Sequence, residues 1–189
     1  MRPKDEQKIE AIFAAVIKLT GSGGIAGLKM TDIAREAGVA DGTLYTYFRS
    51  KEELLNSVYY QLKQKGALAI VDGIDHLPVK VQLYKMWKNS LKYQVNEPAK
   101  TIFLEHFKVS PFISEDNKKL SQQLGQYLEK LLERGKEEMI IKPLSNELLI
   151  SLLTGFLKDY AHYLVNHDLE VTENKAEESF SLSWDAIKA

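Results

Sequence analysis

The segment from Asp41 to Phe48 carries small and hydroxyl-bearing side chains at the spacing of one short helix. Leu44 and Phe48 stand four positions apart, so they predict the buried side of that helix. A helix that enters the major groove of DNA needs small side chains where its backbone approaches the bases, and hydroxyl or cationic groups that hold phosphates. The segment supplies both and predicts a DNA-reading helix. The residues left for a partner are Asp41, Gly42, Thr43, Tyr45, Thr46 and Tyr47.

Flanking residues predict the two helices that must position this segment. The preceding helix begins near Thr31, whose hydroxyl makes a good N-cap. It ends at Gly38, because glycine suits the left-handed conformation that closes a helix. Ser50 and Glu53 have the spacing of a capping box, so the following helix begins there with Lys51 in its first turn. Helix, glycine turn, helix and a further helix in this order predict a helix-turn-helix element.

The sequences Gly42-Thr43-Leu44-Tyr45-Thr46-Tyr47-Phe48 and Ser50-Lys51-Glu52-Glu53-Leu54 closely resemble the TetR family of bacterial transcriptional regulators. The resemblance implies a homodimer that binds an operator in double-stranded DNA and responds to a small-molecule effector. The residues that it places against base edges are Asp41, Gly42, Thr43 and Thr46. The residues that it places against phosphates are Thr31, Tyr45, Tyr47 and Lys51.

Asp41 departs from the family pattern. Many relatives have lysine at this position, and a carboxylate repels phosphate. One interpretation is that Asp41 caps the recognition helix, which is favoured because Ala40 stands where relatives often place a capping serine. The other is that Asp41 accepts a hydrogen bond from a cytosine N4 amine.

Composition is that of an ordinary soluble protein, with 44% hydrophobic and 27% charged residues in a chain of 189. Residues 1–51 carry a net charge of +2 and the remainder −3. This asymmetry is too small to bind DNA by bulk charge, so binding must depend on placed contacts and on dimerisation. The absence of cysteine excludes disulfides, thiolate catalysis and cysteine-based zinc sites.

Targeting signals are weak in this chain. The uncharged run Leu148–Leu157 is about half of the roughly 20 residues needed to span a bilayer. Asp5, Glu6 and Glu10 stand where a signal peptide would be positive. We therefore expect no membrane segment and a cytoplasmic location.

Outside this element, apolar residues recur at helical spacing almost throughout, and no strand-like alternation or repeat intervenes. A first helix over residues 4–20 is expected to end at the glycines of 21–24. We predict an all-α fold of about nine helices. Residues 1–50 form a three-helix, helix-turn-helix DNA-binding head, and residues 51–189 form a helical body for effector binding and dimerisation.

The last two predicted helices, residues 145–166 and 172–189, are assigned to the homodimer interface by the family resemblance. Gly155 supports a hypothesis of a close helix crossing there, since glycine in mid-helix costs about 1 kcal/mol relative to alanine. A monomer that buries these faces internally is the alternative.

The middle of the chain is rich in aromatic residues. The resemblance implies that the helices between the head and the last pair enclose an effector cavity, and bulky rings with few charges suit an apolar or aromatic ligand. Each of these residues is also a plausible core residue. The predicted effector-binding residues are Trp87, Leu91, Phe103, His106, Phe107, Tyr127, Phe156 and Tyr160.

Catalytic and metal sites find no support. Residues 21–26 fit the dinucleotide-binding pattern, but a helix precedes them where a strand is required. Asp159 and His162 lie one helical turn apart, yet a di-iron bundle needs two Glu-x-x-His pairs. We therefore predict a protein that is not an enzyme and needs no cofactor or metal.

The function predicted from these features is a ligand-responsive, DNA-binding transcriptional regulator. It is expected to be a repressor that a small apolar or aromatic effector releases from its operator. The alternative is a helical small-molecule carrier or interaction protein that does not bind DNA. The effector, the operator, the regulated genes and the choice between repression and activation lie beyond the sequence.

Overall fold

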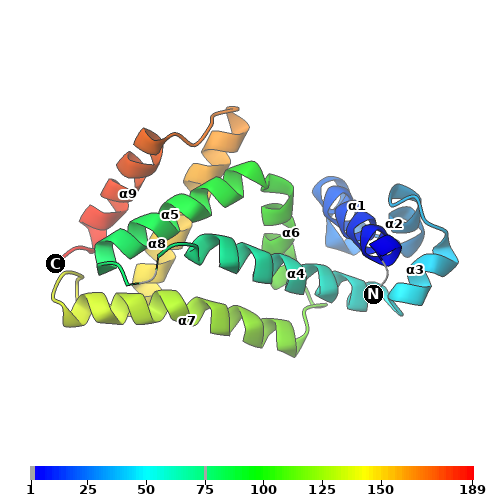
Figure 1. Ribbon diagram of the computed structural model, residues 1–189, viewed down its shortest axis with the longest axis horizontal. Coiled ribbons are helices and arrows are strands. Elements are labelled where there is room, and N and C mark those ends of the chain that lie inside the picture. Colours follow the sequence, from blue (N-terminus) through cyan, green and yellow to red (C-terminus); the bar gives the residue numbers. More distant parts are fainter. Residues whose placement is uncertain (1–2, 75) are drawn as a thin grey trace. The chain divides into compact units, whose positions relative to one another are not determined.

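The computed structural model describes residues 3–74 and 76–189, most of which are helical (Figure 1). The described residues form no strand, although an isolated bridge pairs Ile141 with Lys188. The predicted all-α fold is confirmed. None of the helices in the described part is long and apolar enough to cross a membrane. The helices of this part are α1 (Pro3–Gly27), α2 (Met30–Glu36), α3 (Asp41–Tyr47), α4 (Lys51–Val71), α5 (Val79–Asn96), α6 (Pro98–Lys108), α7 (Glu115–Glu137), α8 (Asn146–Asn166) and α9 (Glu173–Ile187).

Helix α1 continues further than the sequence predicts. Its backbone stays helical to Gly27 except at Gly24, which adopts a φ of 65° and a ψ of 172°. Glycine reaches this positive φ without strain, so the chain is kinked there. The helix predicted to end at the glycines of 21–24 is broken at Gly24, inside that range, and a short segment beyond it stays helical to Gly27. Thr20 and Ile25 on either side of the kink are both buried.

The chain divides into two compact units. The first comprises Met1–Gln64 with Ala99–Leu120, and the second comprises Lys65–Pro98 with Ser121–Ala189. Helices α4 and α7 therefore contribute residues to both units. These units describe packing, whereas the division at residue 50 concerns function and stays a prediction.

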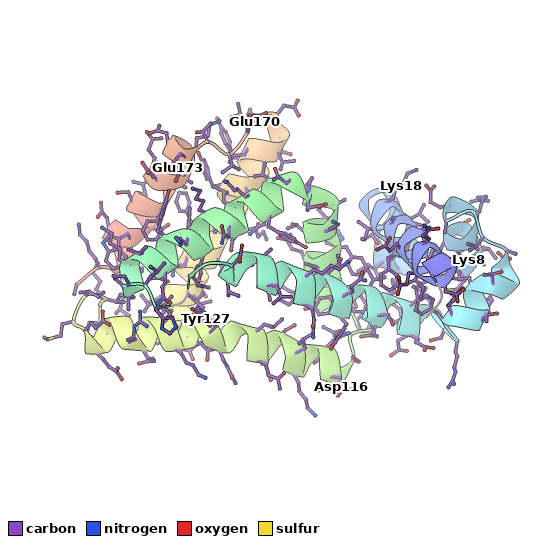
Figure 2. All side chains as sticks on the ribbon, in the orientation of Figure 1. Lys8, Lys18, Asp116, Tyr127, Glu170 and Glu173 are labelled. Atoms are coloured by element: carbon purple, nitrogen blue, oxygen red, sulfur yellow. The ribbon has the colours of Figure 1, made fainter. Side chains whose placement is uncertain are left out.

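The core of the first unit joins the N-terminal helices to α6. Ile33, Leu44 and Leu54 are fully buried there, and so are Phe103 and Phe107. The two phenylalanine rings stack with centroids 5.6 Å apart, and the Tyr59 ring lies 5.3 Å from that of Phe107. At the surface, the Lys18 ammonium of α1 pairs with the Glu36 carboxylate of α2 at 2.6 Å (Figure 2). This exposed pair contributes little to stability, so the head is held together by its apolar core.

The second unit packs α5 against α8 and α9 (Figure 1). A polar connection accompanies the apolar core, because the indole nitrogen of Trp87 donates to the Ser179 hydroxyl at 3.0 Å. Near the start of α9, Tyr84 donates to the Glu173 carboxylate at 2.6 Å and Lys88 pairs with it (Figure 2). Lys88 and then Tyr84 lower the pKa of Glu173 by these hydrogen bonds. Burial, followed by the bond to Glu173, raises the pKa of Tyr84, so the phenol stays a donor.

Candidate DNA-reading surface and effector cavity

The turn between α2 and α3 has the geometry that its glycine predicts. Gly38 adopts a φ of 67°, in the left-handed region. The amides of Ala37, Gly38 and Val39 donate to the carbonyls of the last turn of α2 at 2.9–3.2 Å. The half-buried Val39 packs on the core of the first unit. The backbone amides of the turn are therefore hydrogen-bonded to the end of α2, and this fixes the angle between α2 and α3.

The two predicted caps at this element are wrong. Lys29 is the N-cap of α2 and makes no side-chain capping bond, while Thr31 lies inside the helix with its side chain exposed. Ala40 is the N-cap of α3, and Asp41 is the first helical residue without a capping hydrogen bond. An extended residue before each helix forms the cap by its backbone alone. The hydroxyl of Thr31 and the carboxylate of Asp41 are consequently exposed at helix N-termini, where the helix dipole favours negative charge.

Helix α3 buries one side and exposes the other. Leu44 is fully buried, as the sequence predicts, and Thr43 is half-buried. Tyr45 is 52% exposed. The Thr46 hydroxyl donates to the Gly42 carbonyl at 2.8 Å, so only its lone pairs stay available. A Cβ added at Gly42 would meet no heavy atom within 4 Å, and the first turn of α3 therefore presents bare backbone.

Tyr47 is engaged within the protein. Its hydroxyl donates to the Asp5 carboxylate of α1 at 2.8 Å, and this hydrogen bond raises the pKa of Tyr47. The phenol therefore stays protonated and remains a hydrogen-bond donor. A phosphate contact by Tyr47, which stays a prediction, requires the phosphate to replace Asp5.

Lys51 has a structural role that the sequence analysis did not predict. Its ammonium donates to the carbonyls of Ile25, Ala26 and Leu28 at 3.3, 3.2 and 2.9 Å, and it lies 5.3 Å from the centre of the Phe112 ring. It thus satisfies carbonyls at the C-terminal end of α1. Lys51 places a positive charge in the first turn of α4, where the helix dipole disfavours it. This unfavourable position is the sequence feature that could have indicated that Lys51 binds a partner outside its own helix. The predicted phosphate contact of Lys51 is untested.

Replacing Lys51 with methionine is expected to destabilise the protein. Methionine keeps the apolar stem but leaves the carbonyls at the end of α1 without their donor, which costs about 1–3 kcal/mol. Urea unfolding followed by circular dichroism measures the change. Lys65→Met on the same helix is the control, because Lys65 is exposed. Equal midpoints for the two variants would contradict this role.

The start of α4 is fixed by a capping box and by an amide network. The Glu53 amide donates to Ser50 Oγ at 3.1 Å as predicted, but the Glu53 carboxylate accepts from the Arg49 amide at 2.8 Å rather than from Ser50. Asn56 donates to the Phe112 carbonyl at 2.8 Å, and the buried Asn117 donates to Asn56 Oδ1 at 2.8 Å. The network ties α4 to the α6–α7 connection inside the first unit.

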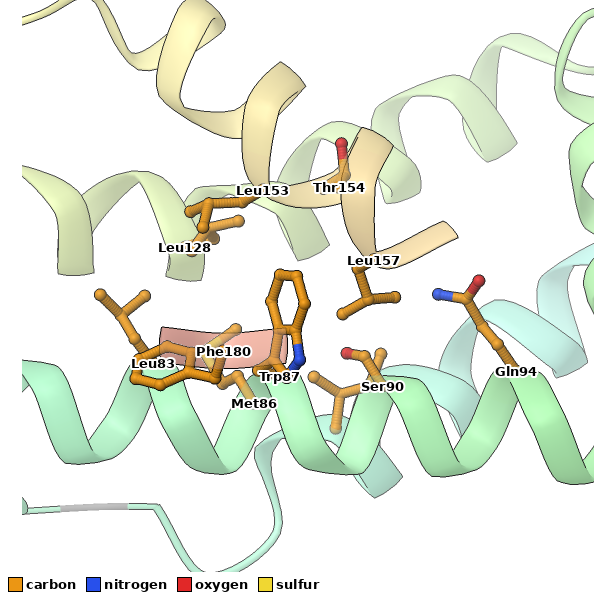
Figure 3. Close-up of a pocket in the computed structure, with 11 residues that line it drawn as sticks. Leu83, Met86, Trp87, Ser90, Gln94, Leu128, Leu153, Thr154, Leu157 and Phe180 are labelled. Carbon is orange, nitrogen blue, oxygen red and sulfur yellow. The ribbon is translucent and has the colours of Figure 1, made fainter. Parts of the chain in front are cut away.

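The second unit contains an apolar cavity of about 240 Å³ (Figure 3). This volume lies just below the roughly 300–1,000 Å³ typical of ligand sites, so it suits a small molecule. Three of its lining residues are polar: Ser90, Gln94 and Thr154. The apolar lining residues are Ile70, Leu83, Met86, Trp87, Leu128, Leu153, Leu157 and Phe180.

The polar groups of the cavity differ in their partners. The Thr154 hydroxyl donates to the Ile150 carbonyl of its own helix at 2.7 Å. Gln94 Oε1 is buried and has no hydrogen-bond partner. An unsatisfied buried acceptor costs about 1–3 kcal/mol. Figure 3 shows the amide nitrogen of Gln94 on the cavity side, so this oxygen meets a bound donor only when the amide turns over.

Helices α8 and α9 expose large apolar side chains. Leu148, Leu152 and Tyr163 on α8 are 55%, 37% and 51% exposed, and Leu182 on α9 is 65% exposed. A Cβ added at Gly155 would meet no heavy atom within 4 Å. The close crossing predicted from Gly155 is therefore absent inside the protomer, and the space above this glycine is open.

Two family models match the chain. The model described as bacterial regulatory proteins, tetR family, matches residues 12–58. The model described as tetracyclin repressor-like, C-terminal domain, matches residues 78–188, which is more than half of the chain. The chain belongs to the TetR family. TetR-family proteins are DNA-binding transcriptional regulators and not enzymes, so the family agrees with the helix-turn-helix geometry of α2 and α3.

Several TetR-family and related regulators are similar to this chain. An uncharacterized HTH-type transcriptional regulator of Haemophilus influenzae is 30% identical over 112 residues, 59% of this chain and 60% of the relative, so less than two thirds of its length is matched. The fatty acid metabolism regulator protein of Bacillus subtilis is 40% identical over 58 residues, 31% of this chain and 28% of the relative. The crystal structure of a TetR family transcription regulator from Marinobacter aquaeolei VT8 has a TM-score of 0.90 at 23% identity. The match covers 100% of this chain and 99% of that chain, and at this identity it supports only a common fold.

The structure does not bring the predicted effector-binding residues together. Trp87 lines the cavity. Phe103 and Phe107 lie instead in the core of the first unit, and His106 is exposed. The sequence could not separate these alternatives, because an aromatic residue on the apolar face of a helix has the same spacing whether it contacts a ligand or the core.

The remaining predicted residues lie in the second unit but do not line the cavity. Leu91 is fully buried in a separate small cluster, and Tyr127 donates to the Gln82 side chain at 3.1 Å. The Phe156 ring lies 5.7 Å from Trp87 and 6.1 Å from Tyr160. Part of the lining that the sequence analysis missed follows a single face of α5. Its signal is the spacing of three, four and four positions through Leu83, Met86, Ser90 and Gln94.

Proposed function

We propose that this chain is a homodimeric repressor that a small apolar or aromatic effector releases from its operator. The cavity in the second unit carries this proposal, because it offers an uncharged site to a small molecule. Residues 1–50 serve DNA binding, and residues 51–189 serve effector binding and dimerisation. Such a regulator acts in the bacterial cytoplasm, where the DNA is.

The exposed side of α3 supports operator binding. Gly42 leaves the helix backbone open, while Tyr45 and Thr46 offer oxygens beside it. Thr43, with Asp41 at the helix N-terminus, completes the surface proposed to face the bases. Thr31, Tyr45, Tyr47 and Lys51 are proposed to hold phosphates, and for Tyr47 and Lys51 the internal partners must be exchanged first.

Dimerisation through α8 and α9 is supported by their exposed apolar residues. Leu148 and Leu152 lie one turn apart on α8, and the open space at Gly155 allows another helix to approach closely. Monomeric proteins rarely expose contiguous apolar patches larger than roughly a few hundred Å². Two copies can then place their recognition helices one duplex turn apart, about 34–36 Å, in successive major grooves.

Release follows if the effector prefers the conformation that does not bind DNA, since a ligand with equal affinity for both conformations shifts nothing. Helix α4 supplies Ile70 to the cavity and begins at Lys51, four residues after the recognition helix α3 ends at Tyr47. We therefore assign α4 the transmission of the effector signal. The sequence likeness to the fatty acid metabolism regulator protein covers 31% of the chain, so that protein's name does not identify the effector of this chain.

Operator binding is tested with Tyr45→Phe, which removes a hydroxyl from a side chain that is 52% exposed. Loss of a phosphate hydrogen bond is expected to weaken binding by at least about tenfold, because charge-assisted hydrogen bonds contribute about 1.5–3 kcal/mol. Fluorescence anisotropy on labelled DNA from the promoter region of its own gene measures the affinity. Tyr60→Phe on α4 is the matched control, since Tyr60 is also 52% exposed.

Equal affinity of the two tyrosine variants would remove Tyr45 from the DNA contact, and no binding by the wild type to any promoter fragment would sink the operator proposal. Transcription from the bound promoter after deletion of the gene distinguishes the direction of control. A repressor predicts a rise, whereas a fall indicates an activator.

A further inference from the structure

The cavity of the second unit has two ends of different chemistry (Figure 3). Leu83, Leu128 and Phe180 lie towards one end of the view, whereas Ser90 and Gln94 lie towards the other. Ser90 and Gln94 are four residues apart on α5, so they share one face of the helix. A bound molecule is therefore oriented, with its apolar part among the leucines and its polar part beside the amide.

No ionisable side chain is among the described residues that line this cavity. A buried carboxylate would lack a lysine, arginine or histidine to pair with, and a buried ammonium would lack an aspartate or glutamate. Burying an unpaired charge is far more costly than burying a neutral polar group. The lining thus discriminates against ionised ligands.

The Gln94 amide decides which neutral group fits. Its Oε1 is buried without a hydrogen-bond partner, and Figure 3 shows its Nε2 turned towards Leu157. An amide offers both a donor and an acceptor. A hydroxyl group matches both, because it can accept from Nε2 or donate to Oε1, whereas a ketone or an ether can only accept.

We infer that the effector is an uncharged molecule with an apolar or aromatic body and one hydroxyl group, which Gln94 binds at the polar end of the cavity. This inference rests on the proposed function for the identity of the cavity as the effector site. It adds the chemical class of the ligand and the residue that selects it.

The test uses three para-substituted ethylbenzenes. 4-Ethylphenol and 4-ethyltoluene have nearly equal shape, and 4-ethylbenzoate carries a larger, ionised group. Isothermal titration calorimetry at pH 7 on the full chain is expected to give at least about tenfold tighter binding of 4-ethylphenol than of 4-ethyltoluene, as a hydrogen bond of about 1.4 kcal/mol implies. 4-Ethylbenzoate is expected not to bind. The same titrations monitored with labelled operator DNA report release.

Gln94→Leu is expected to abolish the preference for 4-ethylphenol and to keep 4-ethyltoluene binding. Because the variant removes an unsatisfied buried oxygen, the thermal midpoint of the free protein is expected to stay equal or to rise. Gln123→Leu on α7, where Gln123 is exposed, is the control and is expected to keep the preference. A lower midpoint for Gln94→Leu would show that the amide has a partner in the free protein and would overturn the inference.

Equal binding of 4-ethylphenol and 4-ethyltoluene, or tight binding of 4-ethylbenzoate, also overturns the inference. If 4-ethyltoluene or 4-ethylbenzoate binds and releases the DNA, the proposed function survives without the requirement for a hydroxyl group. If no probe binds while operator binding is intact, the inference fails and the DNA-binding part of the proposed function stands. Loss of operator binding by the wild type in the absence of any probe would instead count against the proposed function.

Discussion

Gly42→Ala is expected to weaken operator binding by about 10- to 100-fold while leaving the free protein as stable as before or more stable. A methyl group at this position meets no heavy atom within 4 Å in the protein, so it causes no internal clash. In a helical position alanine is favoured over glycine by up to about 1 kcal/mol. If the backbone of α3 approaches the bases, the same methyl group stands in the interface and costs about 1–3 kcal/mol of binding.

Gly125→Ala is the matched control for this variant. Gly125 lies within α7, and its added Cβ also meets no heavy atom within 4 Å. We expect a similar gain in stability without a change in DNA affinity. Fluorescence anisotropy at fixed salt and thermal unfolding of both variants measure the two effects. Unchanged affinity in Gly42→Ala would mean that the first turn of α3 stays away from the bases.

Leu148→Lys is expected to convert the proposed dimer to monomers and to reduce operator affinity by about 100-fold or more. Leu148 is 55% exposed in the protomer, so lysine is tolerated there in a single chain. In an interface the ammonium would be buried without a partner, which opposes association. Loss of the second head removes the avidity gain of about 10²–10⁴ that linked binding modules provide. Sedimentation velocity at micromolar concentration measures the mass.

Leu68→Lys separates loss of the interface from loss of solubility or folding. Leu68 is 70% exposed on α4 and receives the same charge change. It is expected to leave the mass and the operator affinity unchanged. Gly155→Leu is a second interface variant, because a Cβ at this position meets no heavy atom within 4 Å in the single chain. A wild-type chain that sediments at 21.5 kDa, or dimers that persist in both interface variants, would contradict the proposed interface.

Local patterns in the sequence predict the helices and the turn well. Gly38 and the buried Leu44 indicate the geometry between α2 and α3, because a glycine stop and a helical spacing are properties of a few neighbouring residues. The predicted caps fail at Thr31 and Asp41. In both cases the preceding residue, in extended conformation, forms the cap through its backbone. Residue preferences at N-cap positions rest on side-chain hydrogen bonds, so they do not predict a cap of this kind.

Long-range contacts explain the other differences. Tyr47 and Lys51 stand at motif positions where the family resemblance implies phosphate contacts. Their polar atoms instead bind Asp5 and the end of α1. These partners stand 42 and 23 or more residues away along the chain, so no local pattern reports them. Phe103 and Phe107 likewise belong to the core of the first unit, because α6 packs with the N-terminal helices rather than around the cavity.

By itself, the sequence determined the all-helical fold, the position of the DNA-reading helix and the family, since these depend on spacings of three to seven residues and on a contiguous motif. The tertiary structure alone decided which side of α5 lines the cavity and that the Gln94 acceptor is left unsatisfied. It also decided that the space above Gly155 is open within one chain. The physical reason is that burial and hydrogen-bond satisfaction depend on which helices meet. Apolar spacing indicates that a helix has an inner face, but not which neighbour covers it.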